Sequence, residues 1–142
     1  MPGFERHRPG ALSAAETAAA LARCKARLDP LGLYPRPVRL RFVRVLVTPW
    51  LFRLPWFGRF DGYTMWDWIF LRRPLHAGAS EDLLCHELCH VWQMQHHPLR
   101  MPLSFVRHGY EGNRYELEAR RATSASTVRE NEKPGEVPPS MA

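Results

Sequence analysis

The chain has 142 residues, of which 45% are hydrophobic and 24% are charged, and its formal net charge is +6. A chain of this length builds one domain with a modest core and leaves little room for a second. It contains no run of about 18 apolar residues and no apolar signal core, so we expect neither a membrane-spanning helix nor a secretory signal, and a cytoplasmic protein. The arginines are scattered from Arg6 to Arg129, so nucleic acid is not an expected partner.

The first part of the chain predicts a helix followed by strand structure. Ser13 and Glu16 form a capping-box pattern that opens an alanine-rich helix. This helix is expected to reach about Leu28, where the Asp-Pro-Leu-Gly sequence of residues 29–32 ends it. Residues 38–47 begin with alternating apolar and basic side chains, which predicts one strand, or two, with one face buried.

Residues 48–60, TPWLFRLPWFGRF, form an unusually apolar connection whose prolines and glycine argue against a long regular element. We expect this segment to pack as a connection in the core. The alternative is a lip that contacts a membrane surface or an apolar substrate, because exposed aromatic patches rarely lack a purpose. The side chains available for such a contact are Trp50, Phe52, Trp56 and Phe57.

The middle of the chain predicts a second strand and a capped helix. Residues 61–64 resemble a turn, and Met65–Leu71 reads as a strand. Ser80 is a good N-cap for a helix that should run to about His96 and end before Pro98.

The last part of the chain predicts two more helices and a tail. A short helix is expected near residues 103–107, and a longer one from about Asn113 to Ser124. Residues 126–142 are polar and contain prolines, which predicts disorder. We therefore expect a single domain over residues 1–125, followed by this tail.

The helix before Pro98 carries the motif His86-Glu87-Leu88-Cys89-His90 among apolar residues that cover most of its circumference, so it should be buried. A buried carboxylate needs a partner, and a bound dication would provide one. Residues four apart share one helical face, so His86 and His90 can both reach one tetrahedral zinc ion. Glu87 would lie beside the metal, where it can accept a proton from zinc-bound water.

A catalytic zinc site needs a third protein ligand and an open fourth position. His96 lies about 15 Å along the helix axis from His86, which is too far. Glu116 and Glu118 flank the apolar arc of the last helix on either side, and His108 lies in the preceding connection. The residues alone therefore leave three candidates, namely His108, Glu116 and Glu118.

The three cysteines are too few, and their number is odd, for a disulfide framework. We expect Cys24, Cys85 and Cys89 to behave as small buried apolar residues. A redox or metal-binding role for the last two is the alternative, because they are four residues apart on the motif helix.

The runs IFLRRPL, LLCHELCHVWQ and NRYELEARRA resemble gluzincin-type metallopeptidases, particularly the small bacterial domains of the DUF4157 kind. The resemblance covers about residues 62–124 and includes the pattern H-E-x-x-H-x-x-Q. It implies that Glu116 is the third zinc ligand. The chain departs from the family at Arg120, where an Asp or Asn usually supports a zinc histidine. The acidic residues that could substitute for it are Glu81, Asp82 and Glu118.

We expect an α+β, zincin-like fold, in which a small and mainly antiparallel sheet packs on the buried motif helix, with helices at both ends. In zincin-like sites the strand before the motif helix lines the cleft. A peptide substrate could then pair with the edge of the strand at Met65–Leu71.

These residues predict a zinc-dependent metallopeptidase with one Zn²⁺ per chain. His86, His90 and Glu116 would bind the metal, and Glu87 would act as the general base on zinc-bound water that attacks a peptide carbonyl. A further donor to the oxyanion could be His108, Tyr110 or Tyr115. One alternative is a zinc-binding interaction domain without turnover, and a weaker one is a basic, aromatic surface protein in which the motif is incidental.

Overall fold

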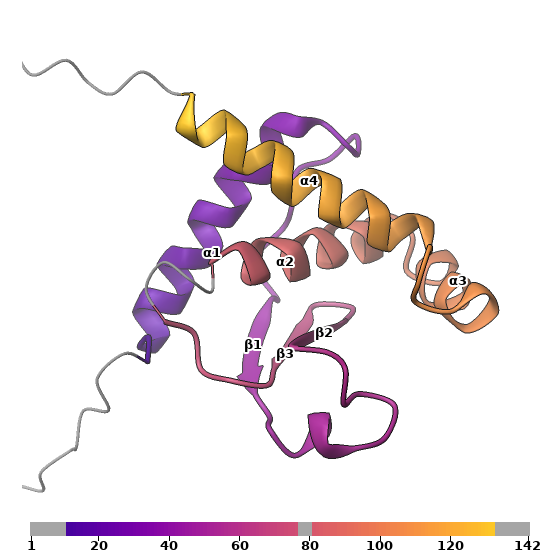
Figure 1. Ribbon diagram of the computed structural model, residues 1–142. Helices are drawn as coiled ribbons and strands as arrows, with labels where there is room; N and C mark the ends of the chain where they lie inside the picture. Colours follow the sequence, from indigo (N-terminus) through magenta and orange to yellow (C-terminus); the bar gives the residue numbers. More distant parts are fainter. Residues whose placement is uncertain (1–10, 77–80, 133–142) are drawn as a thin grey trace, which may run out of the picture.

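A computed structural model describes residues 11–76 and 81–132 of the chain (Figure 1). These residues form four α-helices and a three-stranded sheet, so the predicted α+β class is confirmed. The helices α1 (Ala14–Leu28) and α4 (Arg114–Asn131) pack against α2 (Glu81–His96), and the sheet lies on the other side of α2 (Figure 1). The motif helix is therefore the central element of the fold.

Helix α1 begins with the predicted capping box. The Ser13 hydroxyl accepts a hydrogen bond from the Glu16 amide at 3.2 Å, and the Glu16 carboxylate accepts one from the Ser13 amide at 3.0 Å. A short 3-10 turn, η1 (Asp29–Leu31), follows the helix, and Gly32 leaves it with a φ of 61°. Glycine adopts this left-handed conformation without steric cost, which explains how the sequence ends the helix here.

The sheet consists of β1 (Arg44–Val47), β2 (Gly62–Met65) and β3 (Trp68–Leu71), in the order β1-β3-β2. Strands β2 and β3 are antiparallel, whereas β1 and β3 are parallel. The sheet is therefore mixed, and the prediction of a mainly antiparallel sheet was wrong. Alternation along a strand indicates which face is buried, but it does not indicate the direction of the neighbouring strand.

Two strand boundaries also differ from the predictions. The turn expected at residues 61–64 lies instead at Trp66 and Asp67, so the single strand predicted over Met65–Leu71 is part of a hairpin. Trp66 has a φ of 52°, a left-handed conformation typical of tight hairpin turns. A tryptophan gives no turn signal, which explains why the hairpin was missed. Residues 38–43 are irregular, and strand structure begins only at Arg44.

The connection over residues 48–60 lies at one end of the sheet and contains one 3-10 turn, η2 (Leu51–Arg53) (Figure 1). Phe52 is buried, as expected for a packed connection, and it is therefore not available for the alternative apolar contact. By contrast, Trp50 is 64% exposed and Trp56 is 82% exposed. The prediction of a connection packed in the core was therefore right for Phe52 and wrong for these two tryptophans.

Helix α2 matches the predicted element, although its expected N-cap, Ser80, lies outside the described residues. Helix α3 (Arg100–His108) is longer than the short helix predicted near residues 103–107. No helix in residues 11–76 or 81–132 is long and apolar enough to cross a membrane.

Helix α4 begins directly after Asn113, close to its predicted start, and extends well beyond the predicted end near Ser124. The Arg27 side chain donates hydrogen bonds to the hydroxyls of Ser126 at 3.2 Å and Thr127 at 2.7 Å. Residues 126–131, which were assigned to the disordered tail, are therefore helical and held against α1. Glu132 is the C-cap of α4, and residues 133–142 of that tail lie outside the described residues.

The main core lies on both sides of α2. It joins Leu84, Leu88 and Trp92 of this helix to side chains of α1, β3 and α4. The three cysteines are free and fully buried, which agrees with their predicted role as small apolar side chains.

Candidate metal centre

Three predicted ligands meet between α2 and α4, namely His86, His90 and Glu116. The two histidine Nε2 atoms are 3.2 Å apart. The carboxylate of Glu116 places Oε1 at 3.1 Å from His86 Nε2 and Oε2 at 3.0 Å from His90 Nε2. Ligand atoms around a tetrahedral zinc ion with bonds of about 2.0–2.1 Å are about 3.3 Å apart. The three side chains therefore fit one metal ion and form a group that could hold it.

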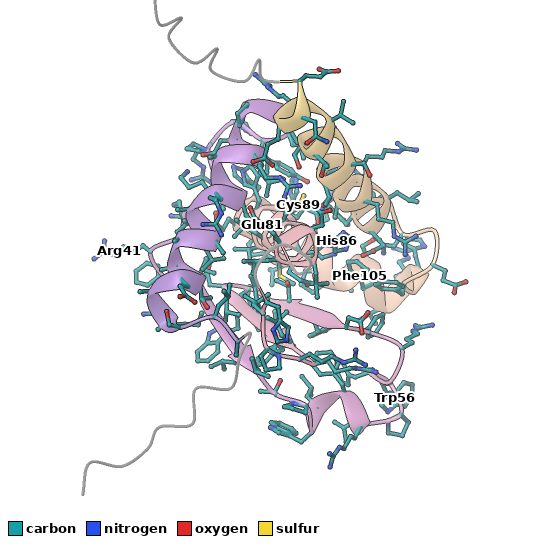
Figure 2. All side chains as sticks on the ribbon, turned by 60° about the vertical axis from the view of Figure 1, so that its left-hand side comes forward. Arg41, Trp56, Glu81, His86, Cys89 and Phe105 are labelled. Atoms are coloured by element: carbon teal, nitrogen blue, oxygen red, sulfur yellow. The ribbon has the colours of Figure 1, made fainter. Side chains whose placement is uncertain are left out.

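Local structure explains why these side chains converge. The two histidines are one helical turn apart on α2, so their rings lie on the same face of the helix. The Asn113 carboxamide caps α4 by accepting a hydrogen bond from the Tyr115 amide at 3.0 Å, which places Glu116 in the first turn. Glu116 is only 2% exposed, and the His86 side chain extends from α2 into the space between α2 and α4 (Figure 2).

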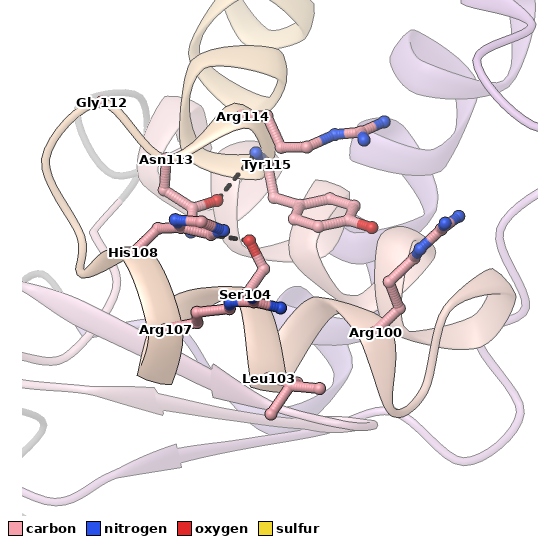
Figure 3. Close-up of a pocket in the computed structure, with 9 residues that line it drawn as sticks. All are labelled: Arg100, Leu103, Ser104, Arg107, His108, Gly112, Asn113, Arg114 and Tyr115. Atoms are coloured by element: carbon pink, nitrogen blue, oxygen red, sulfur yellow. Dashed lines mark hydrogen bonds between the residues drawn. The ribbon is translucent and has the colours of Figure 1, made fainter.

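The other two candidates for the third ligand lie elsewhere. Glu118 accepts hydrogen bonds from the Tyr34 hydroxyl and from the Gln93 amide, and it does not join the histidines. His108 is exposed and lines a second pocket with Tyr115, Arg100, Arg107 and Arg114 (Figure 3). Among the candidates that periodicity left open, the structure brings only Glu116 to the histidines.

Electrostatics favours a negative charge at this site. Burial opposes ionisation of Glu116, but hydrogen bonds with His86 and His90 outweigh it and hold the pKa of the carboxyl below its ordinary value. For His90, burial alone would lower the pKa, but the hydrogen bond with Glu116 raises it above the ordinary value. The buried carboxylate is thus paired with both imidazoles, and a metal ion would bind among these three groups.

Two further groups contact the Glu116 carboxylate. The Tyr110 hydroxyl donates to Oε1 at 2.8 Å, and Arg120 Nε donates to the same atom at 3.1 Å. Burial raises the pKa of Tyr110 to about 12, so its hydroxyl keeps its proton at neutral pH. Arg120, which stands where the resemblance leads us to expect an acid, therefore binds the carboxylate of the candidate ligand Glu116.

Support for His90 comes from Gln93, a fully buried residue that we did not assign to the site from the sequence. Its Oε1 lies 2.8 Å from His90 Nδ1, while its Nε2 donates to the Tyr115 carbonyl at 2.8 Å and to Glu118 Oε1 at 3.2 Å. Since both N–H groups of the Gln93 amide already donate hydrogen bonds, Gln93 Oε1 accepts a hydrogen bond from the protonated Nδ1 of His90. His90 Nε2 is then left with a lone pair for a metal.

A sequence signal for this role was present. Gln93 follows His90 by three residues, a spacing that places two side chains on one helical face. Of the three acids considered as substitutes for the missing one, Glu118 is the one linked to a histidine, through Gln93, whereas Asp82 lines the cleft without bonding to either histidine in the described residues. Glu81 and Asp82 pair instead with Arg23 and Arg27 of α1.

Replacing Gln93 with alanine is expected to lower zinc affinity by about 10–100-fold, because His90 loses the partner that fixes its ring and tautomer. Competition with a chromophoric chelator would measure this affinity. The matched control is Gln95→Ala, since Gln95 is on the same helix but bonds to the Arg39 backbone. Equal zinc affinity in the Gln93→Ala variant and the wild type would show that the bond does not support the ligand.

Glu87, the expected general base, lines the same cleft as the candidate ligands His86 and Glu116 and is 4% exposed. Its Oε2 accepts a hydrogen bond of 2.6 Å from the Thr64 hydroxyl of β2. A Cβ atom on Gly62 would lie 2.8 Å from Glu87 Oε1, so the glycine leaves the space that this carboxylate occupies. Gly62, Glu87 and the ligands His86 and Glu116 line one open cleft.

The remaining predictions for the cleft are met in part. Of the three side chains expected as oxyanion donors, Tyr110 lines the cleft, whereas His108 and Tyr115 line the second pocket. The strand expected to offer its edge to a peptide, Met65–Leu71, does not do so, because β3 is paired on both sides. In the described sheet, the terminal strand beside the cleft is β2, which begins at Gly62.

Fold and side chains together define an α+β protein with a candidate metal centre of two histidines and one glutamate. Comparison of the chain with protein-family models, curated proteins and solved structures finds no match. Its function is therefore inferred from the chemistry of the cluster and of the cleft beside it.

Proposed function

We propose that this protein is a zinc-dependent metallopeptidase with a zincin-like fold. The observation that carries the proposal is the approach of His86, His90 and Glu116 to within 3.0–3.2 Å of one another, with Glu87 beside them. Two imidazoles and one carboxylate are a donor set of hydrolytic zinc sites, in which the fourth position is open to water or substrate. The resemblance of the helix motif to gluzincins supports the same assignment.

The side chains of the cleft have distinct roles in this proposal. A bound zinc ion would act as a Lewis acid that polarises a carbonyl and lowers the pKa of water. Glu87 is the general base: Thr64 holds its Oε2, and Oε1, beside Gly62, can accept a proton and then deliver it to the leaving amine. Tyr110 keeps its hydroxyl proton. Once this hydroxyl no longer donates to Glu116, it can donate a hydrogen bond to a developing oxyanion.

The substrate is proposed to be an extended peptide that pairs with β2. This strand ends the described sheet, and a terminal strand has backbone donors and acceptors available for β-augmentation. Gly62 has no side chain to block the approach of a peptide to Glu87.

A zinc-binding domain without turnover is the second candidate. The observation that favours it is the occupation of Glu116 Oε1 by both Tyr110 and Arg120. These donors compete with a metal ion for the carboxylate, and Arg120 replaces the acid expected from the resemblance.

Removal and return of zinc would test the proposal. Purified protein stripped with a chelator is expected to lose hydrolysis of internally quenched peptides and to recover it at one equivalent of zinc per chain. Zinc binding without hydrolysis across a broad peptide library would favour the second candidate. Failure to bind zinc, or hydrolysis that persists after chelation, would contradict the proposal.

A further inference from the structure

The face of the sheet turned away from α2 is apolar and aromatic. On the side toward α2, Thr64, Ile69 and Leu71 are buried. On the opposite side, β3 carries Trp68, which is 48% exposed, and Phe70, whose ring stacks on it at 6.4 Å. The helices lie on the other side of the sheet (Figure 1). Within residues 11–76 and 81–132, no helix covers this apolar surface, to which Leu46 and Met65 also belong as register partners of these two aromatic residues.

The connection over residues 48–60 extends this surface. The Phe57 ring packs edge-on against Tyr63 of β2, with centroids 4.9 Å apart, and Tyr63 pairs in register with Phe70. The neighbouring Trp56 projects from the edge of the molecule (Figure 2), and Trp50 lies three residues after the last residue of β1. Of the five tryptophans in the chain, only Trp92 is buried.

The same part of the chain carries the positive charge. Residues 36–73 contain eight arginines and two aspartates, a net charge of +6 that equals the charge of the whole chain. Within the described residues, none of these eight arginines forms an ion pair with a carboxylate. Their charges are therefore available to an external anionic partner.

We infer that this surface docks on an anionic phospholipid bilayer. The surface, called here the Trp–Arg face, consists of two adjoining parts: Arg44, Leu46, Met65 and Trp68 of the sheet, and the exposed Trp50, Arg53, Trp56 and Arg59 of the connection. Tryptophan favours the membrane–water interface, where its ring meets apolar tails and its N–H meets water. Arginines beside it are attracted to anionic headgroups.

Other occupants fit this face less well. A second copy of the chain would bring two faces of like charge together, which repel each other. Nucleic acid would pair with the arginines and stack on the tryptophans, but it offers no apolar partner to Leu46 and Met65. Arg59 and Phe60 also line the metal cleft, so docking would hold the cleft close to the membrane surface.

Co-sedimentation with vesicles tests this inference independently of any hydrolysis. The protein is expected to bind phosphatidylcholine vesicles that contain phosphatidylserine at least about tenfold more tightly than pure phosphatidylcholine vesicles, and to release them as salt rises. The double variant Trp50→Ala/Trp56→Ala is expected to bind about tenfold more weakly, because it removes apolar area from the interface. Arg53→Glu/Arg59→Glu should weaken binding by at least about tenfold.

Matched controls separate the face from overall hydrophobicity and charge. Leu99→Ala/Val106→Ala removes exposed apolar side chains at α3, and Arg107→Glu/Arg121→Glu reverses two exposed arginines outside the face. Both control variants should bind the phosphatidylserine-containing vesicles more tightly than the corresponding variants of the Trp–Arg face. Circular dichroism should show that all four variants fold.

Four results would overturn the inference. The first is equal binding of both vesicle types, and the second is equal loss of binding in the face and control variants. The third is tighter binding to single-stranded DNA, with displacement of the protein from vesicles by that DNA. The fourth is a dimer in light scattering that disappears in Trp50→Ala/Trp56→Ala, which would make the face a contact between copies.

Discussion

The Glu87→Gln variant is expected to hydrolyse peptides about 10²–10⁴-fold more slowly than the wild type and to keep one zinc ion per chain. Glutamine has nearly the same volume as glutamate, and its side-chain oxygen can still accept the hydrogen bond from Thr64. It cannot accept a proton from water at neutral pH. Peptide kcat/KM and elemental analysis of the purified variant would measure the two effects separately.

Glu111→Gln is the matched control for this variant. Glu111 is an exposed glutamate at the rim of the same cleft, and no ion pair with it is found in the described residues. The control should hydrolyse peptides at nearly the wild-type rate, which separates loss of the base from loss of negative charge in the cleft. Wild-type hydrolysis in Glu87→Gln would remove Glu87 from the proposed mechanism.

Features that depend on a few neighbouring residues could be predicted from the sequence. The capping box of Ser13 and Glu16 is a local pattern, and α1 begins where this pattern places it. The spacing of His86 and His90 is equally local, because helical geometry alone sets two side chains one turn apart on the same face.

Features that depend on distant parts of the chain were harder to predict. Periodicity could not distinguish Glu116 from Glu118, because the choice depends on how α4 packs against α2; only the family resemblance favoured Glu116. The parallel pairing of β1 with β3 likewise joins strands that the connection over residues 48–60 and strand β2 separate in the sequence. The extension of α4 depends on Arg27 of α1, which a local reading of residues 126–131 does not include.

Loss of a supporting residue lowers zinc affinity by about 10–100-fold. The Glu116→Gln variant is expected to lose more affinity than that, because it removes a direct ligand. A carboxamide keeps the volume of the side chain but supplies no negative charge between His86 and His90. Glu118→Gln is the matched control, because Glu118 is on the same helix and reaches the site only through Gln93. Thermal unfolding of the metal-free proteins would show whether either variant fails to fold.

The central claim is that one ion is held jointly by His86, His90 and Glu116. Zinc content per chain, measured by mass spectrometry on the wild type, Glu116→Gln and Glu118→Gln purified side by side, tests it most directly. We expect one zinc ion in the wild type and in Glu118→Gln, and almost none in Glu116→Gln. Full zinc occupancy in Glu116→Gln, or its loss only in Glu118→Gln, would contradict the proposed ligand set.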